Sequence, residues 1–324
     1  MHKSNLILVF LWLCQCHAFV DPNQSVNSSS NRHALILQAT PANEGYITIH
    51  RDNSQHQLSY RIARPMSLSS KQAAPILTLH GGPSLPSSYL YPLEECIPYR
   101  SIIYFDQLGC GKSDEPADSS LYSIENTVHD LHVLIKQLGI RRFHLYGHSY
   151  GGILAFEYMK SLVVSEEKND VECLSAVLSS APYHISKLER DFDRLTQKLI
   201  PDDRTLSDAE VGELFRINHQ CRLPEMPAQL ARAYANPGTV WFGTQVIADY
   251  VAQPPPGDAA RMPSTLIMRG EYDFVGEECF DEWKKVINRK FVRCKTLDNC
   301  SHHGLYENSA LYGETIDSYF AEYD

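Results

Sequence analysis

The sequence predicts an α/β protein in which a mostly parallel central sheet is flanked by helices. Short apolar runs recur along the chain, and several end at glycine or polar residues. Runs that are apolar on both faces are typical of parallel strands buried on both sides. Stretches of helical composition separate them, and such alternation produces parallel sheets with right-handed crossovers. The runs interpreted as buried strands are Pro75–Leu79, Ser101–Phe105, Phe143–Tyr146, Leu174–Leu178 and Thr265–Met268.

The remaining elements follow from residue patterns. Tyr46–His50 and Gln57–Arg61 are expected to pair as antiparallel strands. Between residues 125 and 138, apolar residues recur every three or four positions, which predicts a helix. Residues 186–258 interrupt the alternation, because they are rich in Asp, Glu and Arg and end in a proline-rich turn. We interpret this segment as a mainly helical lid inserted between two parts of one sheet, with a separate domain as the alternative.

The start of the chain resembles a secretory signal. Lys3 provides a positive charge, Leu6–Cys14 is an apolar run, and Cys16–Ala18 fits a cleavage site. The alternatives are a membrane anchor and a buried N-terminal strand. The run is shorter than the roughly 20 apolar residues that span a bilayer, which argues against the anchor. We expect residues 1–18 to be a signal peptide and the mature chain to be secreted or periplasmic, without a membrane span. The core then comprises residues 19–185, which begin with a polar leader, and residues 259–324, with the lid between them.

Charge and cysteine content exclude several function classes. The net charge is −10 and Lys and Arg form no cluster, so the chain lacks the basic surface that nucleic-acid binding requires. After the signal an odd number of cysteines remains, so at least one thiol is free or pairs between chains, although some disulfides are expected. No C-x-x-C pair remains, and neither a metal site nor a cofactor is expected. Gly109–Ser113 ends like a phosphate-binding loop, but Asp106 stands where that motif requires glycine.

A candidate nucleophile lies in the sequence Gly147-His148-Ser149-Tyr150-Gly151, which fits the pattern G-x-S-x-G. The motif follows an apolar strand and precedes a stretch of helical composition. In that context the glycines allow strand and helix to approach closely, while the serine hydroxyl is exposed on a strained turn. The alternative is a glycine-rich turn with a passive serine. The strand–turn–helix context favours Ser149 as the nucleophile of a hydrolase.

A serine nucleophile needs a base, and the base needs a group that orients it. In this architecture the order along the chain is serine, acid, histidine. Asp273 lies just after the predicted strand that ends at Met268, and His302 follows it. We therefore assign His302 as base and Asp273 as the orienting acid. Glu271 and His303 are the competing choices, since each lies within two residues of the preferred one.

The loop His80-Gly81-Gly82-Pro83 follows the first predicted buried strand. In hydrolases of this architecture, the corresponding loop supplies one backbone N–H of the oxyanion hole, and the residue after the nucleophile supplies the other. Those positions are Gly82 and Tyr150 here. The alternative for the loop is a simple Gly-Pro turn.

Together these motifs resemble the α/β-hydrolase superfamily, and within it the proline iminopeptidase family of serine aminopeptidases. The resemblance runs from about residue 40 to the C-terminus, and Asp-Gln-x-Gly-x-Gly-x-Ser is its most discriminating element. The motifs are His80-Gly81-Gly82-Pro83, Asp106-Gln107-Leu108-Gly109-Cys110-Gly111-Lys112-Ser113, Gly147-His148-Ser149-Tyr150-Gly151-Gly152, Gly270-Glu271-Tyr272-Asp273 and Ser301-His302.

This resemblance implies an α/β-hydrolase fold and an enzyme that cleaves an N-terminal residue, often proline, from short peptides. Family members usually carry acids that bind the free amine. One directly follows the catalytic Asp, where this chain has Phe274, and another lies in a Gly-Pro-x-Glu lid element, whose nearest match, Gly243–Val246, has no acid. Trp241, Phe242 and Phe274 instead predict an apolar substrate pocket. The alternatives are a hydrolase of an ester, lactone or non-peptide amide, and a catalytically silent binding protein.

Overall fold

The computed structural model describes residues 42–51, 54–65, 73–164, 170–203, 205–240 and 247–324. The signal proposed at residues 1–18 and the polar leader lie outside these residues, so export stays a prediction from the sequence. No described helix is both long and apolar enough to span a membrane.

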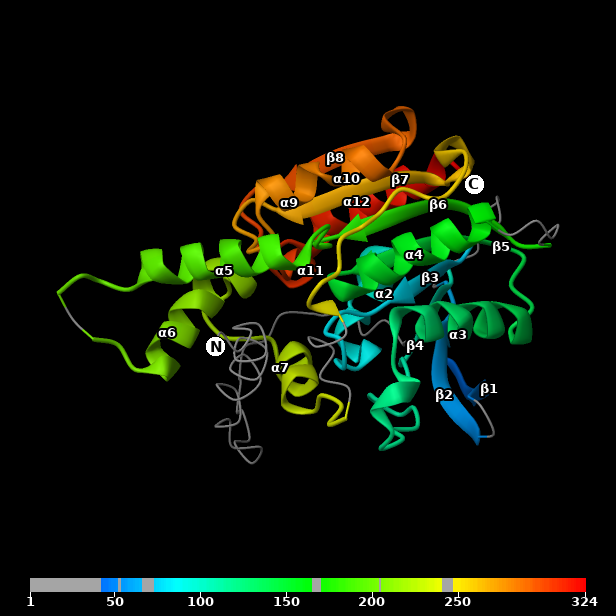
Figure 1. The fold of residues 1–324 in the computed structure, drawn as a ribbon, viewed down its shortest axis with the longest axis horizontal. Coiled ribbons are helices and arrows are strands. Elements are labelled where there is room, and N and C mark those ends of the chain that lie inside the picture. Colours follow the sequence, from blue (N-terminus) through cyan, green and yellow to red (C-terminus); the bar gives the residue numbers. More distant parts are fainter. Residues whose placement is uncertain (1–41, 52–53, 66–72, 165–169, 204, 241–246) are drawn as a thin grey trace, which may run out of the picture.

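An eight-stranded sheet forms the centre of the molecule, in the order β1-β2-β4-β3-β5-β6-β7-β8 (Figure 1). The β1–β2 and β2–β4 pairs are antiparallel, as predicted for the first two strands, and every pair from β4 to β8 is parallel. The strands are β1 (Asn43–Arg51), β2 (Ser54–Ala63), β3 (Ile76–Leu79), β4 (Ile102–Phe105), β5 (Arg142–His148), β6 (Glu172–Ser179), β7 (Ser264–Gly270) and β8 (Val292–Leu297).

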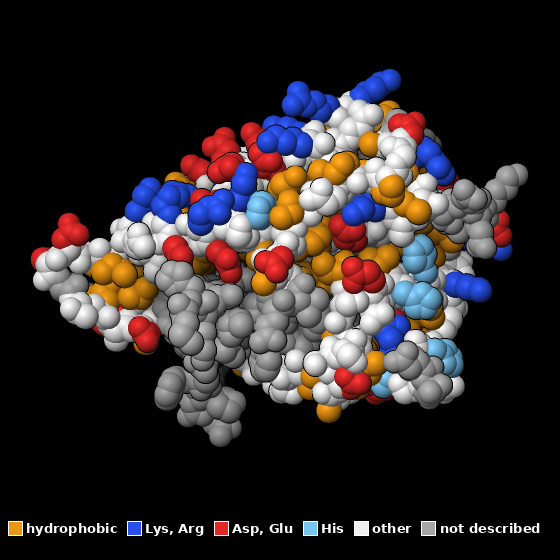
Figure 2. Space-filling model, in the orientation of Figure 1, with side chains coloured by type: hydrophobic (Ala, Val, Ile, Leu, Met, Phe, Trp, Pro, Cys, Tyr) orange, Lys and Arg blue, Asp and Glu red, His pale blue; other side chains and the backbone are white. Residues whose placement is uncertain are grey.

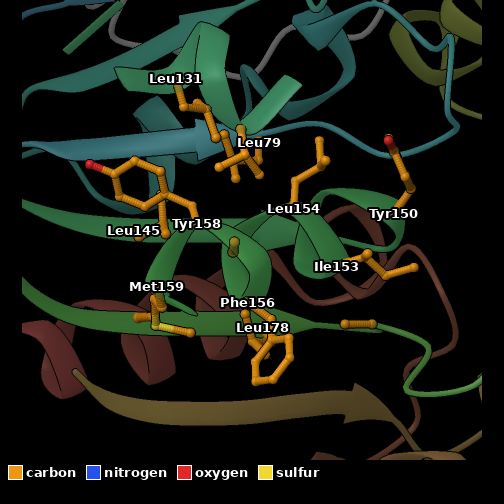
Figure 3. Packing of buried hydrophobic residues seen from close by; sticks show 14 of the residues in the cluster. Leu79, Leu131, Leu145, Tyr150, Ile153, Leu154, Phe156, Tyr158, Met159 and Leu178 are labelled. Atoms are coloured by element: carbon orange, nitrogen blue, oxygen red, sulfur yellow. The ribbon is translucent and has the colours of Figure 1, made fainter. Parts of the chain in front are cut away.

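Helices cover both faces of the sheet, because alternate strand residues point to opposite sides. Leu145 belongs to the core cluster that contains α3, α4, α9 and α10, whereas Tyr146 belongs to the cluster with α2, α11 and α12. Figure 3 shows the first cluster, in which Leu154 and Phe156 of α4 pack beside strand residues such as Leu178. The helices of the core are α2 (Leu93–Cys96), α3 (Ile124–Gln137), α4 (Tyr150–Val164), α9 (Glu277–Asp281), α10 (Trp283–Val286), α11 (Gly304–Glu307) and α12 (Ser309–Ala321).

The predicted lid segment, residues 186–258, connects β6 to β7 and is helical in much of its described part. It contains most of α5 (Ile185–Leu199), α6 (Asp208–Phe215), a π-helical turn (Arg216–Gln220) and α7 (Ala228–Ala235). Lys187 of α5 forms ion pairs with Glu278 and Glu282, at 2.6 and 3.7 Å. These pairs contribute to the mixture of basic and acidic side chains over α5 and α9 in Figure 2. The lid is therefore tied to the core at its first helix.

Two features differ from the sequence-based expectation. The edge strand β8 was not predicted, because Arg293 and Lys295 are exposed and give it no continuous apolar run. All seven cysteines from Cys96 to Cys300 are free thiols, so the expected disulfides are not found among the described residues.

A polar network around the buried side chains of Arg100 and His144 holds the C-terminal helix region against the sheet. Arg100 contacts Asp317 and Asp324, at 2.5 and 2.7 Å. His144 of β5 is fully buried, and its Nδ1 and Nε2 contact the Ser175 hydroxyl and the Asp324 carboxylate at 2.9 and 3.1 Å. Burial lowers the pKa of His144 to about 4, which outweighs the opposing effect of Asp324.

We expect His144 to make stability depend on pH. Its folded-state pKa of about 4 lies below the ordinary value of about 6.5, so the unfolded chain takes up the proton first and stability falls as the pH is lowered through this window. The contribution lost between pH 7.5 and 5 is about 2 kcal/mol. Urea unfolding at both pH values measures it, and His144→Gln should flatten the pH dependence by that amount. The exposed His50 provides the control, because His50→Gln should retain the wild-type dependence. An unchanged slope in His144→Gln would contradict the prediction.

Candidate active site

The residues predicted to form the site meet at one edge of the sheet. Ser149 directly follows β5, Asp273 lies three residues after β7, and His302 lies in the loop between β8 and α11. Gly82 lies in the loop after β3. Because β3, β5, β7 and β8 are parallel, their carboxyl ends lie at the same edge, where open α/β sheets bind ligands.

The turn that carries Ser149 requires glycine on both sides. Ser149 has a positive φ of 56°, which orients its side chain away from the regular strand and helix. A Cβ at Gly147 would lie 2.2 Å from the carbonyl oxygen of Gly151, and a Cβ at Gly151 would lie 2.1 Å from that of Leu79. Strand β5 and helix α4 therefore approach each other as the nucleophile-turn motif predicts.

A direct hydrogen bond joins Asp273 to His302, with 2.9 Å between Oδ1 and Nδ1. Both side chains are buried, and the same Asp273 oxygen accepts the Val275 N–H at 3.0 Å. Burial opposes ionisation of Asp273, but the neighbouring His302 outweighs it and the pKa of Asp273 lies below its usual range. Asp273 is therefore an ionised acceptor, and its bond to Nδ1 leaves Nε2 of His302 available to take a proton.

The competing residues are engaged elsewhere. Glu271 is exposed, and its carboxylate accepts the Asn299 N–H at 2.9 Å. Nε2 of His303 contacts the Tyr234 hydroxyl at 2.8 Å. The structure thus places Asp273 and His302 together, and not Glu271 or His303.

The pocket beside these residues encloses roughly 740 Å³, part of it open to solvent. Ser149 and His302 both line it, although no direct hydrogen bond joins their side chains; such bonds often tighten only when substrate binds. Most of its wall is apolar or aromatic, and helix α5 of the lid supplies part of it. The lining residues are Gly81, Gly82, Leu85, Tyr89, His148, Ser149, Tyr150, Pro182, Ile185, Leu188, Phe192, Tyr234, Ile247, Phe274, His302 and His303.

The two expected oxyanion donors line the same pocket. Tyr150 is the first residue of α4, so its N–H lies in the first turn, where no intrahelical acceptor exists. Gly82 has a φ of 118°, a backbone conformation that favours glycine. The positive end of the α4 dipole adds to the attraction of this corner for a developing negative charge.

Asp106 and Gln107 support the loop His80–Pro83 and the turn that follows it. Gln107 donates its backbone N–H to Nε2 of His80 and its side-chain amide to the His80 carbonyl, both at 3.0 Å. Asp106 accepts the backbone N–H of Ser87 at 2.7 Å and that of Lys112 at 2.9 Å. The Lys112 side chain pairs with Glu44 at 2.9 Å.

Of the three residues predicted to bind substrate, only Phe274 lies among those that the structure describes; Trp241 and Phe242 lie outside them. Phe274 stacks on the His302 ring with 4.1 Å between the centroids and 25° between the planes. It also contacts Phe192 of α5 and Phe215 of α6. Phe274 therefore connects the predicted base to the lid.

Among the described lining residues there is no Asp or Glu. Two acidic residues of the lid segment, Glu213 and Glu225, are not among the lining residues either. Glu213 pairs with Arg216 at 2.5 Å, and Glu225 is exposed. Among the described residues, no group of three or more His, Cys, Asp or Glu side chains is arranged so that it could hold a metal ion.

A comparison with protein families matches residues 74–309 to the α/β-hydrolase fold. The chain belongs to this family. A proline iminopeptidase from Saccharolobus solfataricus is 31% identical over 276 residues, which cover 75% of this hydrolase and 84% of that relative. A crystal structure of proline iminopeptidase from Mycobacterium smegmatis shares the fold with a TM-score of 0.73 at 19% identity, covering 86% of this chain and 98% of that one. Naproxen esterase from Bacillus subtilis also shares it, with a TM-score of 0.59 at 15% identity over 88% and 93% of the two chains.

Sequence reasoning missed several polar residues of this hydrolase's pocket. Tyr89, His148 and Tyr234 form part of its wall, beside His303, which the sequence offered only as an alternative base. Burial lowers the pKa of His148 to about 3 and that of His303 well below its usual range, so both rings are neutral. His148 occupies the variable position of G-x-S-x-G, and Tyr89 lies in no motif, so neither gave a signal in the sequence.

Proposed function

We propose that this protein is a serine hydrolase that releases N-terminal residues, with proline favoured, from short peptides. The observation that carries the hydrolytic part is the Asp273–His302 hydrogen bond beside a pocket that Ser149 also lines. The peptide part is supported by the relative named proline iminopeptidase, which matches most of the chain. A pocket with a largely apolar wall suits the ring of a prolyl residue.

The proposed reaction proceeds through an acyl-enzyme. Ser149 Oγ forms a bond to the acyl carbon while its proton passes to Nε2 of His302. The N–H groups of Gly82 and Tyr150 stabilise the oxyanion. His302 then returns the proton to the leaving nitrogen as the acyl–nitrogen bond breaks. Water, activated by His302 in the same way, hydrolyses the acyl-enzyme and restores the Ser149 hydroxyl.

A second candidate is hydrolysis of an ester, lactone or non-peptide amide. The observation that favours it is that no carboxylate lies among the described lining residues. A free N-terminal amine would therefore find no charged partner among them. The experiment that separates the candidates is a panel of prolyl-anilide, other aminoacyl-anilide and nitrophenyl-ester substrates. The first proposal expects the highest kcat/KM for prolyl-anilide. A preference for the esters far beyond their intrinsic reactivity would favour the second.

We predict a weak requirement for a free amine. A charge-assisted hydrogen bond contributes roughly 1.5–3 kcal/mol, and Phe274 stands where the resemblance to the proline iminopeptidase family implies an acid. Acetylating the amine of a good anilide substrate should therefore change kcat/KM by less than about tenfold, equivalent to about 1.4 kcal/mol. The comparison uses the free and acetylated forms of one substrate under identical conditions. A loss of a hundredfold or more would show that an acid binds the amine, and would contradict the prediction.

A further inference from the structure

A continuous chain of hydrogen bonds links residues of the pocket wall, and it plays no part in the reaction described above. The Gly81 N–H donates to the Tyr89 hydroxyl at 2.7 Å, and that hydroxyl lies 2.9 Å from Nδ1 of His148. Nε2 of His148 lies 3.0 Å from the carbonyl oxygen of His302. Tyr89 and His148 are 1% and 3% exposed, so water does not compete for these bonds.

The direction of every bond in this chain is fixed by chemistry. A carbonyl oxygen only accepts, so Nε2 of His148 carries the hydrogen. His148 is neutral, because burial and then the neighbouring His302 lower its pKa to about 3, and its Nδ1 is therefore an acceptor. The Tyr89 hydroxyl donates to Nδ1, which leaves its oxygen to accept the Gly81 N–H.

The chain joins the loops that carry the proposed catalytic groups. Gly81 directly precedes the oxyanion residue Gly82, His148 directly precedes Ser149, and the far end holds the backbone of His302. The groups around the first hydrogen bond, between Gly81 and Tyr89, are closely packed. A Cβ at Gly81 would lie 3.0 Å from both the Tyr89 hydroxyl and the Ser149 Cβ.

The turn that carries Tyr89 is itself held from several sides. Tyr89 lies in a 3-10 turn, Ser87–Leu90, whose first N–H is bound by Asp106 at 2.7 Å. The Tyr306 hydroxyl of α11 donates to the Tyr89 carbonyl at 2.8 Å. The hydroxyl of Tyr89 is thus held in place independently of the oxyanion loop, and can fix the position of that loop.

We propose that Tyr89 and His148 are positioning residues, which hold the oxyanion loop and the backbone of His302 in register with Ser149. This inference rests on the proposed function. The Gly81 N–H is bound by the Tyr89 hydroxyl, which leaves the next N–H, that of Gly82, for the proposed oxyanion. Such a donor acts mainly in the transition state, so loosening it lowers kcat more than it changes KM.

The test is Tyr89→Phe, which keeps the ring and removes the hydroxyl. Removing an oxyanion donor typically costs about 10²–10³ in kcat, so displacing one should cost about 10- to 100-fold, with KM changed less than about threefold. The inhibition constant of a boronic acid that binds Ser149 as a tetrahedral adduct should rise by a similar factor. Tyr104→Phe, which removes another buried tyrosine hydroxyl near the same turn, is the matched control and should retain wild-type kcat.

His148→Gln breaks the chain at its second residue and carries the test if Tyr89→Phe does not fold. The double variant should lose little more than either single variant, because the chain is already broken. A kcat within twofold of wild type in the folded variants would overturn the positioning role, as would losses that multiply. If the wild-type enzyme hydrolyses no substrate of the panel, the proposed function fails first and this inference falls with it.

Discussion

Replacing Ser149 with alanine is expected to lower kcat by about 10⁴-fold or more, because it removes the hydroxyl on which the proposed acyl-enzyme forms. The fold should survive. Serine and alanine both carry a Cβ, so the positive φ of 56° at this turn is equally strained in both. The measurements are steady-state hydrolysis of the best panel substrate and thermal unfolding of the variant.

Covalent labelling gives a second readout of the same change. A fluorophosphonate should label the wild-type enzyme at Ser149 and leave Ser149→Ala unlabelled, with the site located by peptide mapping. Ser161→Ala, which removes a serine hydroxyl from the far part of α4, should label as the wild type does. Turnover by Ser149→Ala within tenfold of wild type would remove Ser149 from its role. Failure of the wild type to label or to turn over substrate would favour the silent binding protein.

The sequence predicts those parts of the fold and site that depend on local patterns. The buried parallel strands are continuous apolar runs, and the Ser149 turn is marked by glycines that leave no room for a side chain. The edge strand β8 escapes prediction because only one of its faces is shielded, which removes the apolar run. In each case the degree of burial decides whether the pattern is visible.

The parts of the site that the sequence does not predict depend on contacts between segments far apart in the chain. Tyr89 and His148 are 59 residues apart, and nothing in either local pattern indicates that they meet. The choice between Asp273 and Glu271 also required coordinates, since both follow the same strand and only the fold decides which reaches His302.

Asp273→Asn is the second substitution with a very large expected effect. Asp273 Oδ1 contacts Nδ1 of His302 at 2.9 Å and the Val275 N–H at 3.0 Å, so an isosteric amide fits the same space. The amide carries no charge, and it can present an N–H that would favour the wrong tautomer of His302. By analogy with the same change in other serine hydrolases, kcat should fall by about 10⁴-fold. Steady-state kinetics on the best substrate measure this directly.

Glu271→Gln is the matched control for this prediction, because it neutralises a carboxylate two residues away on the same loop. Glu271 is exposed and accepts the Asn299 N–H, an interaction that a glutamine oxygen can still make. We expect its kcat/KM to remain within about threefold of wild type, since surface substitutions usually change energies by less than about 0.5 kcal/mol. The reverse result, with Glu271→Gln inactive and Asp273→Asn active, would transfer the orienting role to Glu271. Because Asp273 is buried against the imidazole and ionised there, its charge is the one able to stabilise the imidazolium that the proposed reaction forms on His302.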